Sequence, residues 1–238
     1  MAGYGNTWSN GKSVYMQLKQ DADGHDLDPA DPDNWTVPTP IYRNDASLLN
    51  GNKQLAATAS GGVGMSLDMT YFQDADGRSY YAWQQLGATY IATMDPKDPA
   101  HVTSSPVRIV TPEYAWNAAI AEGPNVTLRD GKLYLMFSGS GVGKTYTTGL
   151  AVADASGTDL TDPASWTVLN YPIQKSGPFN GEMQLGTGHG MWSEDEDGNQ
   201  IYVFHAYATK NLGSVNAAGR DMFVRRVHWA ADACRCST

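Results

Sequence analysis

One short pattern recurs along the chain and constrains its fold more than any other feature. An Asp-Gly or Asn-Gly pair followed by a strand-like run occurs at Asn10-Gly11, Asp76-Gly77, Asp130-Gly131 and Asp197-Gly198. Such pairs between apolar runs are strong signals for a β-hairpin turn. The four glycines lie 66, 54 and 67 residues apart, a spacing that suits four-stranded propeller blades with long outer loops. The sequence therefore predicts an all-β fold, a β-propeller with about four blades, in a single domain over residues 1–238.

Ionisable residues stand at one shared offset before three of these turns. Nine residues before Gly77, Gly131 and Gly198 stand Asp68, Glu122 and His189. The innermost strands of successive blades converge on the axis of a propeller. We therefore expect these three side chains to face one axial pocket, because a carboxylate buried without a partner is costly. The same count back from Gly11 reaches Ala2, which carries no such group.

The residues around these positions resemble a known family. Glu122-Gly123-Pro124, ahead of the Asp130-Gly131 turn, is similar to the general-acid motif of glycoside hydrolase family 43. Members of that family are five-bladed β-propellers that act as arabinofuranosidases, xylosidases or arabinanases. Ser66-Leu67-Asp68 is similar to the family's second carboxylate, which tunes the pKa of the acid and orients it. Gly186-Thr187-Gly188-His189-Gly190 is similar to the late Gly-x-Gly-His segment, whose His lies near an axial metal ion or water. The resemblance extends over about residues 10–229.

The resemblance implies an inverting glycoside hydrolase in which Glu122 is the general acid. Such an enzyme needs one protonated carboxyl for the leaving oxygen, and a carboxylate roughly 6.5–9.5 Å away that activates water. Asp68, as a nearby like charge, is expected to raise the pKa of Glu122. The expected substrate is an α-L-arabinofuranoside in plant polysaccharide side chains or oligosaccharides. β-Xylosidase or arabinanase activity, as in other members of the family, is the alternative.

One part of the family pattern is absent. The family's catalytic base is an Asp of the first blade, far upstream of the second carboxylate, whereas only 67 residues precede Asp68. Ala30-Asp31-Pro32 looks like the missing motif. However, Asp31 belongs to an Asp-Pro…Trp pattern that recurs at Asp162, so we predict an outer turn there. We therefore expect the chain to lack the first of five blades and to hydrolyse glycosides poorly by itself. A non-catalytic carbohydrate-binding propeller is the second alternative.

Four further residues are candidates for substrate binding. Tyr114 and Trp116 lead into the Glu122 strand, and they suit either a sugar-stacking platform or a core between blades. Arg220 is a candidate partner for the pocket carboxylates. His189 is expected to contact the sugar or to hold an axial calcium ion, although a lone strand His is usually a hydrogen-bonded structural residue. No cofactor is otherwise expected.

Charge and composition exclude several kinds of partner. A net charge of −9 and a pI near 4.8 argue against nucleic acid, which basic patches bind. No apolar run approaches the roughly 18 residues of a membrane span, so no membrane partner is expected. Residues 1–9 lack the features of a signal peptide, and a cytoplasmic or secreted location both stay open. The expected partner is an arabinose- or xylose-containing oligosaccharide. The four carboxylates of residues 21–28 do not have EF-hand spacing, so we predict a solvated turn there.

Overall fold

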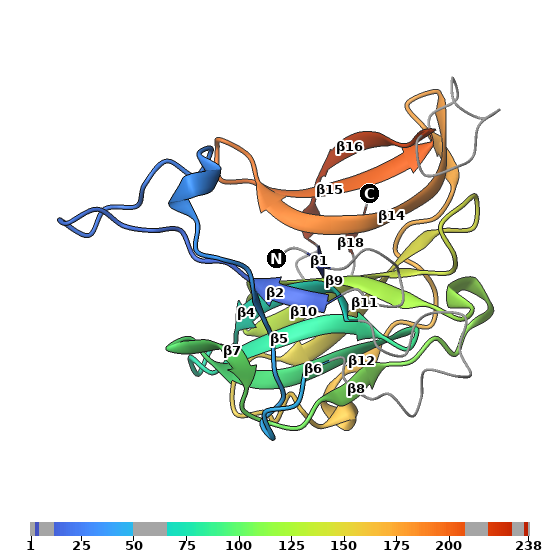
Figure 1. Cartoon of the computed structure of the whole chain (residues 1–238). Coiled ribbons are helices and arrows are strands. Elements are labelled where there is room, and N and C mark those ends of the chain that lie inside the picture. The colour runs from blue at the N-terminus through green and yellow to red at the C-terminus, as the bar shows by residue number, and fades with distance from the viewer. Residues whose placement is uncertain (1–2, 5–11, 50–65, 208–218, 230–235, 238) are drawn as a thin grey trace.

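A computed structural model describes residues 3–4, 12–49, 66–207, 219–229 and 236–237 of the chain. Almost all regular structure in these segments is β-strand, as the sequence predicts, and the helices are single 3-10 turns (Figure 1). None of the helices in these segments is long and apolar enough to cross a membrane.

The strands form three large sheets, one small sheet and a terminal pair. The small sheet contains β1 (Gly3–Tyr4), β2 (Lys12–Tyr15) and β3 (Thr39–Pro40). The second sheet contains β4 (Leu67–Gln73), β5 (Ser79–Gln85), β6 (Ala88–Asp95), β7 (Asp98–Val102) and β8 (Val107–Val110). The third contains β9 (Ala121–Arg129), β10 (Lys132–Gly139), β11 (Thr147–Asp154) and β12 (Thr167–Val168). The fourth contains β13 (Gly177–Phe179), β14 (Glu182–Glu194), β15 (Gln200–Tyr207) and β16 (Asp221–Arg226). The terminal pair is β17 (His228–Trp229) with β18 (Cys236–Ser237), and the 3-10 turns are η2 (Pro32–Asn34), η4 (Ala115–Asn117) and η5 (Pro163–Ser165).

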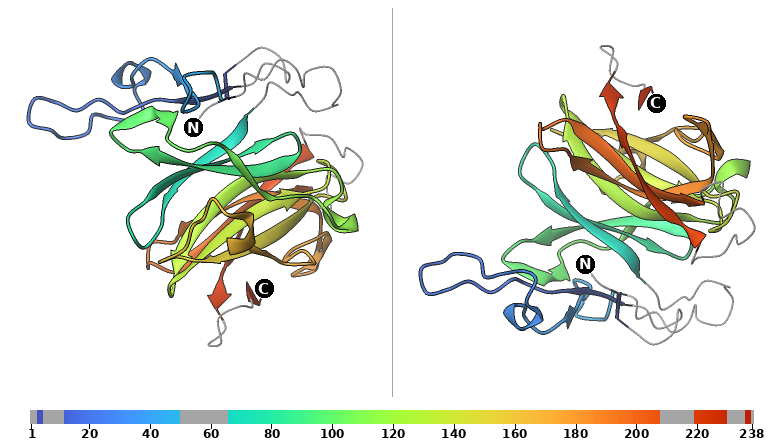
Figure 2. Two further views of the ribbon diagram at one scale, coloured as in Figure 1. Left: turned by 90° about the horizontal axis from the view of Figure 1, so that it is seen from below. Right: turned by 90° about the horizontal axis from the view of Figure 1, so that it is seen from above.

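The sheets follow one another around the molecule in chain order. The sheet of β9 to β12 lies between the sheet of β4 to β8 and the sheet of β13 to β16 (Figure 2). Apolar residues of β5, β6, β10 and β11 form one buried cluster between the sheet of β4 to β8 and the sheet of β9 to β12. A second buried cluster, from β10, β11 and β15, lies between the sheet of β9 to β12 and the sheet of β13 to β16. As a result β9 contacts both β4 and β14, as neighbouring inner strands of a propeller do.

The hairpin turns confirm the repeat and also show that it has two forms. The turn glycine has a left-handed backbone in all three described hairpins, at Gly77 (φ 80°), Gly131 (φ 74°) and Gly198 (φ 75°). Asp130 also has a positive φ of 48°, so this hairpin closes with a two-residue turn. The other two turns are longer, since the last paired residues are Gln73 with Ser79 and Glu194 with Gln200. Within them the carbonyls of Asp74 and Asp195 each accept a hydrogen bond from the glycine three residues later. The Asn10-Gly11 pair lies outside the described residues.

The two Asp-Pro…Trp segments form the same outer turn, as predicted. Asp31 and Asp162 each cap a 3-10 turn by accepting a hydrogen bond from the amide N–H two residues later, at 2.9 Å. The indole N–H of Trp35 and that of Trp166 each donate to the carbonyl six residues earlier. Asp31 is therefore a turn residue on the outside of the fold.

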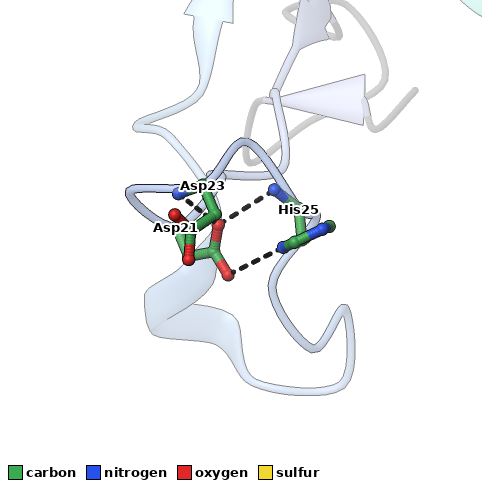
Figure 3. A group of neighbouring side chains, drawn as sticks. All are labelled: Asp21, Asp23 and His25. Carbon is green, nitrogen blue, oxygen red and sulfur yellow. Dashed lines mark hydrogen bonds and ion pairs between the residues drawn. The ribbon is translucent and has the colours of Figure 1, made fainter.

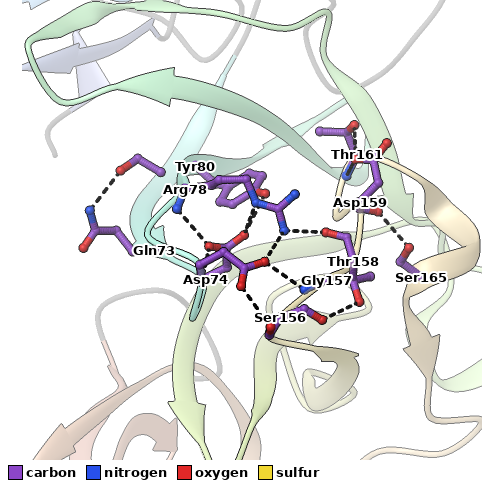
Figure 4. Close-up of polar contacts among 12 residues, drawn as sticks. Gln73, Asp74, Arg78, Tyr80, Ser156, Gly157, Thr158, Asp159, Thr161 and Ser165 are labelled. Carbon is purple, nitrogen blue, oxygen red and sulfur yellow. Dashed lines mark hydrogen bonds and ion pairs between the residues drawn. The ribbon is translucent and has the colours of Figure 1, made fainter.

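A polar clamp joins the β4–β5 turn to the loop that follows β11 (Figure 4). The carboxylate of Asp76 accepts hydrogen bonds from Ser156 Oγ at 2.9 Å and from Gly157 N at 2.8 Å. Arg78 bridges the same two segments, since its Nε donates to Asp74 at 2.7 Å and its Nη2 to the carbonyl of Thr158 at 2.7 Å. These contacts fix neighbouring sheets at the end of the hairpin remote from Asp68.

The acidic loop of residues 21–28 is a solvated turn (Figure 3). Asp21 Oδ1 accepts hydrogen bonds from the amides of Asp23 and His25, both at 2.9 Å. The ring of His25 lies 3.4 Å from the other carboxylate oxygen. The three side chains are exposed, and their hydrogen bonds within the loop account for their grouping.

Candidate active site

The structure brings Asp68, Glu122 and His189 together from three sheets. Asp68 lies near the start of β4, Glu122 near the start of β9 and His189 in the middle of β14. His189 Nε2 is 3.6 Å from Asp68 Oδ1, and Asp68 Oδ2 accepts a hydrogen bond from Gly123 N at 3.1 Å. We call these three residues, together with Tyr146 described below, the axial cluster.

A β-bulge places each of the three side chains. The pairing register shifts beside Asp68 in β4, beside Gly123 in β9 and beside His189 in β14. Asp68, Gly123 and His189 have left-handed backbones, with φ of 54°, 60° and 49°. A bulge adds a residue to one strand and re-aims its side chains, which here turns them away from the regular ladder. Non-glycine residues adopt this conformation only where the surrounding structure holds them in it.

The shared nine-residue offset is wrong by one position at Glu122. Gly123, eight residues before its turn glycine, occupies the bulge position that Asp68 and His189 occupy in their strands. The physical reason is the shorter two-residue turn at Asp130, which brings the strand nearer to its glycine. Glu122 precedes the bulge, and its side chain still joins the cluster through Tyr146.

Tyr146 is a member of the site that the sequence did not reveal. It precedes β11, is fully buried, and donates a hydrogen bond to Glu122 Oε1 at 2.6 Å. Its hydroxyl is also 3.2 Å from His189 Nδ1. Because the hydroxyl proton goes to Glu122, its oxygen can accept only from a protonated Nδ1 of His189. A relay from His189 through Tyr146 to Glu122 therefore fixes the orientation of all three.

Glycines around His189 are explained by close packing. A Cβ on Gly188 would lie 2.4 Å from the ring of Tyr146, and one on Gly190 would lie 2.2 Å from Tyr202. Gly186 has φ 63°, and a Cβ there would lie 2.0 Å from the carbonyl oxygen of Gly143. Gly188 therefore leaves room for the ring of Tyr146, and the other two glycines allow close packing on Tyr202 and on the backbone at Gly143.

The environment of Glu122 favours its protonated form. Burial raises the pKa of Glu122 above its ordinary value, and the negative charge of Asp68 raises it further. The hydrogen bond from Tyr146 and the charges of His189 and Arg220 act in the opposite direction, but the net shift is upward. The effect expected from Asp68 is present, although burial is the larger cause. Burial and Glu122 also raise the pKa of Tyr146, which stays a hydrogen-bond donor.

Arg220 and His205 lie beside the axial cluster. Arg220 Nη1 is 2.7 Å from His205 Nε2. The ring of His205 stacks on Tyr146, with centroids 5.5 Å apart, and on His189, with centroids 6.2 Å apart. Arg220 thus lies near enough to Glu122 to lower its pKa, and a role in substrate binding stays a prediction.

Trp116 and Tyr114 form a stacked pair, with ring centroids 6.0 Å apart and planes 7° apart. Trp116 also stacks on Phe137, packs against the buried cluster between sheets, and donates its indole N–H to the carbonyl of Asn170 at 2.9 Å. These contacts agree with the core interpretation of Trp116. A sugar-stacking role for Tyr114 stays a prediction.

The axial cluster is a poor match for a calcium cage made by protein side chains. Calcium takes six to eight oxygen ligands. Among the described residues, a group of three or more close ligand atoms occurs at Asp21, Asp23 and His25, and the axial cluster forms no such group. His189 offers ring nitrogens, of which Nδ1 faces Tyr146. A calcium ion on His189 stays a prediction, and no step below uses one.

The described geometry is that of a propeller whose axial cluster pairs a carboxyl of raised pKa with a second carboxylate. Comparisons with known proteins agree. The family model for glycosyl hydrolases family 43 matches residues 52–234. An extracellular exo-α-(1→5)-L-arabinofuranosidase of Streptomyces avermitilis is 32% identical over 180 residues, which are 70% of this chain and 36% of that protein. An α-L-arabinofuranosidase 43 of Humicola insolens is 31% identical over 181 residues, with the same shares of the two chains.

A solved structure shows the same fold. The α-L-arabinofuranosidase of Lactobacillus brevis superposes with a TM-score of 0.70 and 24% identity, covering 95% of this chain and 72% of that one. The chain belongs to glycosyl hydrolases family 43. It spans 36% of the length of the two curated relatives named above.

Proposed function

We propose that this chain forms the acid side of the active site of an inverting α-L-arabinofuranosidase. The observation that carries the proposal is the half-buried Glu122 carboxyl with its raised pKa, which Tyr146 orients beside Asp68. The curated relatives are named arabinofuranosidases, which favours arabinofuranosides over xylosides as substrates. An α-L-arabinofuranosyl group on a plant polysaccharide or oligosaccharide is the proposed substrate.

Glu122 is the proposed general acid. Tyr146 donates to Oε1, so the acidic proton is carried on Oε2, where it can pass to the glycosidic oxygen as the bond breaks. The carboxylate that this transfer produces is stabilised by the hydrogen bond from Tyr146 and by the charge of Arg220. Tyr146 therefore orients the acid before the transfer and stabilises the charge after it.

Asp68 is the proposed partner of the acid. Its charge keeps the proton on Glu122, and its hydrogen bond from Gly123 N ties the β4 bulge to the β9 bulge. His189 and Arg220 are proposed to bind the sugar hydroxyls. Inversion also needs a carboxylate that activates water. Asp31 is excluded from that role because it caps an outer turn, and we assign the base to no described residue.

The test is Glu122→Gln in the longest form of the protein that carries this chain. Turnover of arabinofuranosides with poor leaving groups should fall by at least ~10²-fold, because general acid catalysis contributes about that much. Aryl arabinofuranosides with activated leaving groups should be affected less, since these groups need little protonation. Glu113→Gln, a change at an exposed acid in the segment before β9, is the matched control and should leave turnover unchanged.

Three outcomes would contradict the proposal in whole or in part. Equal losses on both substrate classes would remove Glu122 from the acid role. Absence of turnover in the unaltered protein, with arabinose oligosaccharides still bound, would favour a carbohydrate-binding propeller. Faster hydrolysis of β-xylosides than of α-L-arabinofuranosides would leave Glu122 as the acid and make a β-xyloside the preferred substrate.

A further inference from the structure

A groove lies on the face of the β4–β8 sheet that points away from the β9–β12 sheet. Side chains alternate between the two faces along a strand, and residues paired directly across two strands share a face. Phe72 and Tyr80 are paired and belong to the buried cluster shared with the β9–β12 sheet. Tyr71 and Tyr81, the neighbouring pair, therefore point to the opposite face, where they line the groove.

The small sheet and the chain that follows it cover the rest of this face. β2 contacts β4 and β7, and Ile41 and Leu49 form a buried cluster with Tyr81. The groove beside them has a volume of about 690 Å³, within the range of roughly 300–1,000 Å³ typical of ligand sites. Its lining side chains come from β2 and the segment after it, from β4, β5 and β6, and from the β6–β7 turn, and include Tyr15, Gln17, Tyr71, Tyr81, Met94 and Lys97.

The groove is separate from the axial cluster, which contributes none of its described lining residues. Tyr71 follows Asp68 by three positions on β4. At about 3.3 Å per residue, the two lie roughly 10 Å apart along the strand. A long ligand can therefore reach both places on one molecule.

The aromatic side chains of the groove are held in place from behind. Tyr81 is 3% exposed, and its hydroxyl donates a hydrogen bond to the carbonyl of Pro99 at 2.9 Å. Tyr71 packs edge-on against it, with ring centroids 6.3 Å apart and planes 70° apart, and its hydroxyl lies 3.2 Å from Ser79 Oγ. Tyr71 is nevertheless 44% exposed. A fixed ring with one open side offers a sugar an apolar surface to stack on and a polar edge.

Polar groups along the groove are available to a ligand. Tyr15 is half-buried, and Gln17 and Lys97 are exposed. In the described part of the chain, the side-chain polar groups of these three residues form no hydrogen bond or ion pair. A hydroxyl, an amide and an ammonium group can all bind sugar hydroxyls, and the described lining contains no carboxylate. An apolar segment seated in the groove would instead leave these groups unpaired, which is unfavourable.

We propose that this groove is a second carbohydrate site, which binds a neutral stretch of the polysaccharide away from the bond that is cut. This inference rests on the proposed function, because that function supplies the polysaccharide. One curated relative is named an exo-α-(1→5)-L-arabinofuranosidase, which favours a chain of α-(1→5)-linked arabinofuranose as the ligand. A second site on the same molecule raises the effective concentration of the polymer at the axial cluster without taking part in the cleavage.

Electrophoresis through gels that contain linear α-(1→5)-arabinan tests the groove directly. The protein is the longest form that carries this chain, with Glu122→Gln so that the polymer is not cut. Adding Tyr71→Ala should weaken the affinity for arabinan at least about 5-fold, the usual effect of truncating an aromatic anchor in a binding site. Tyr171→Ala, at a tyrosine that is 67% exposed and lies outside the groove, is the matched control and should not change the affinity.

A second variant guards against a folding defect in Tyr71→Ala, which a thermal melt detects. Gln17→Ala combined with Lys97→Ala changes two exposed side chains and should also weaken the affinity for arabinan. Equal affinities in the groove variants and in the Tyr171→Ala control would overturn the proposal. Proline-rich peptides also dock in aromatic-lined grooves, and binding of such a peptide without binding of arabinan would overturn it as well.

Kinetics of the protein with Glu122 intact separate this inference from the proposed function. Tyr71→Ala should raise KM for arabinan more than KM for an aryl arabinofuranoside, which is too short to reach the groove. Turnover of arabinofuranosides with an arabinan affinity that does not depend on the groove would overturn the inference and leave the proposed function. Groove-dependent binding of arabinan without turnover would contradict the proposed function and leave the second site in place.

Discussion

Two aspartates, one near the start of strand β4 and one just after its end, have opposite surroundings. Asp74, in the turn that follows the strand, has a fully buried side chain whose oxygens accept four hydrogen bonds, from the amides of Asp76 and Arg78, Arg78 Nε and Tyr80 OH. Asp68, at the other end, has a side chain that is 22% exposed, accepts a hydrogen bond from Gly123 N, and faces His189. The same residue type is thus satisfied at one end of the strand and left available at the other.

The backbone conformations of Asp74 and Asp68 differ in the same way. Asp74 occupies a turn whose carboxylate-to-amide hydrogen bonds are the usual reason for an Asp at that place. Asp68 has φ 54°, in a region that non-glycine residues seldom adopt. A carboxylate that is fully bonded contributes to stability and cannot respond to a ligand. We infer that the bulge at Asp68 keeps its carboxylate available for chemistry, and that the strained backbone conformation there is the cost.

Asp68→Asn should have the largest effect on activity. Loss of the charge beside Glu122 should lower kcat/KM for arabinofuranosides by about 10²–10⁴-fold, the range for groups that support general acid catalysis. The melting temperature should change little, because Asp68 has few hydrogen bonds to lose. Steady-state kinetics beside a thermal melt checks both parts. A variant with full activity and a lowered melting temperature would make Asp68 a structural residue like Asp74.

Asp74→Ala should show the reverse. It removes the acceptor of four hydrogen bonds and leaves the buried Tyr80 hydroxyl and Arg78 Nε without their acceptor, while Arg78 Nη2 keeps its contacts with Asp76 and Thr158. Arg78 is 43% exposed, so solvent screens its loss. The unpaired Tyr80 hydroxyl is buried, and leaving such a group unsatisfied typically lowers the free energy of unfolding by about 1–3 kcal/mol. Denaturant unfolding measures this loss. Activity per folded molecule should be retained, and a loss comparable to that of Asp68→Asn would show that the clamp also positions the site.

The sequence predicted the features that depend on local chemistry. The hairpin glycines, the Asp-Pro…Trp turns and the approach of Asp68, Glu122 and His189 follow from turn residues and repeat spacing. The length of a turn is harder to infer from sequence. Asp130-Gly131 forms a two-residue turn, whereas the similar pairs lie in longer turns, so Glu122 stands one position before the bulge residue of its strand. Tyr146 and His205 had no local signal at all. Their roles come from contacts with residues 24 and 43 positions away for Tyr146 and 15 for His205.

The pH dependence of activity should separate the two influences on Glu122. A general acid works when protonated, so activity falls as pH rises through the pKa of Glu122. Asp68→Asn removes a charge that raises this pKa, and the alkaline limb should move to lower pH. Tyr146→Phe removes a hydrogen bond that lowers it, and the limb should move to higher pH. Profiles of kcat/KM for each variant test these signs, and shifts in one common direction would contradict the assignment.

Asp76→Asn should have the smallest effect, and its pH dependence distinguishes an exposed clamp residue from buried Asp74. Hydrogen bonds from Gly157 N and Ser156 Oγ lower the pKa of Asp76 below its usual 3.8. Its contribution to stability is therefore complete above that value, where the unfolded state is also ionised, and is lost as pH falls through the lower folded pKa. The substitution should lower the melting temperature at pH 7 by less than Asp74→Ala does, because solvent screens the exposed group. The melting temperatures of the unaltered protein and of Asp76→Asn, recorded from pH 7 to pH 2, should converge at the acid end. A difference that persists there would mean that the Asp76 carboxylate contributes through its shape and packing and not through its charge.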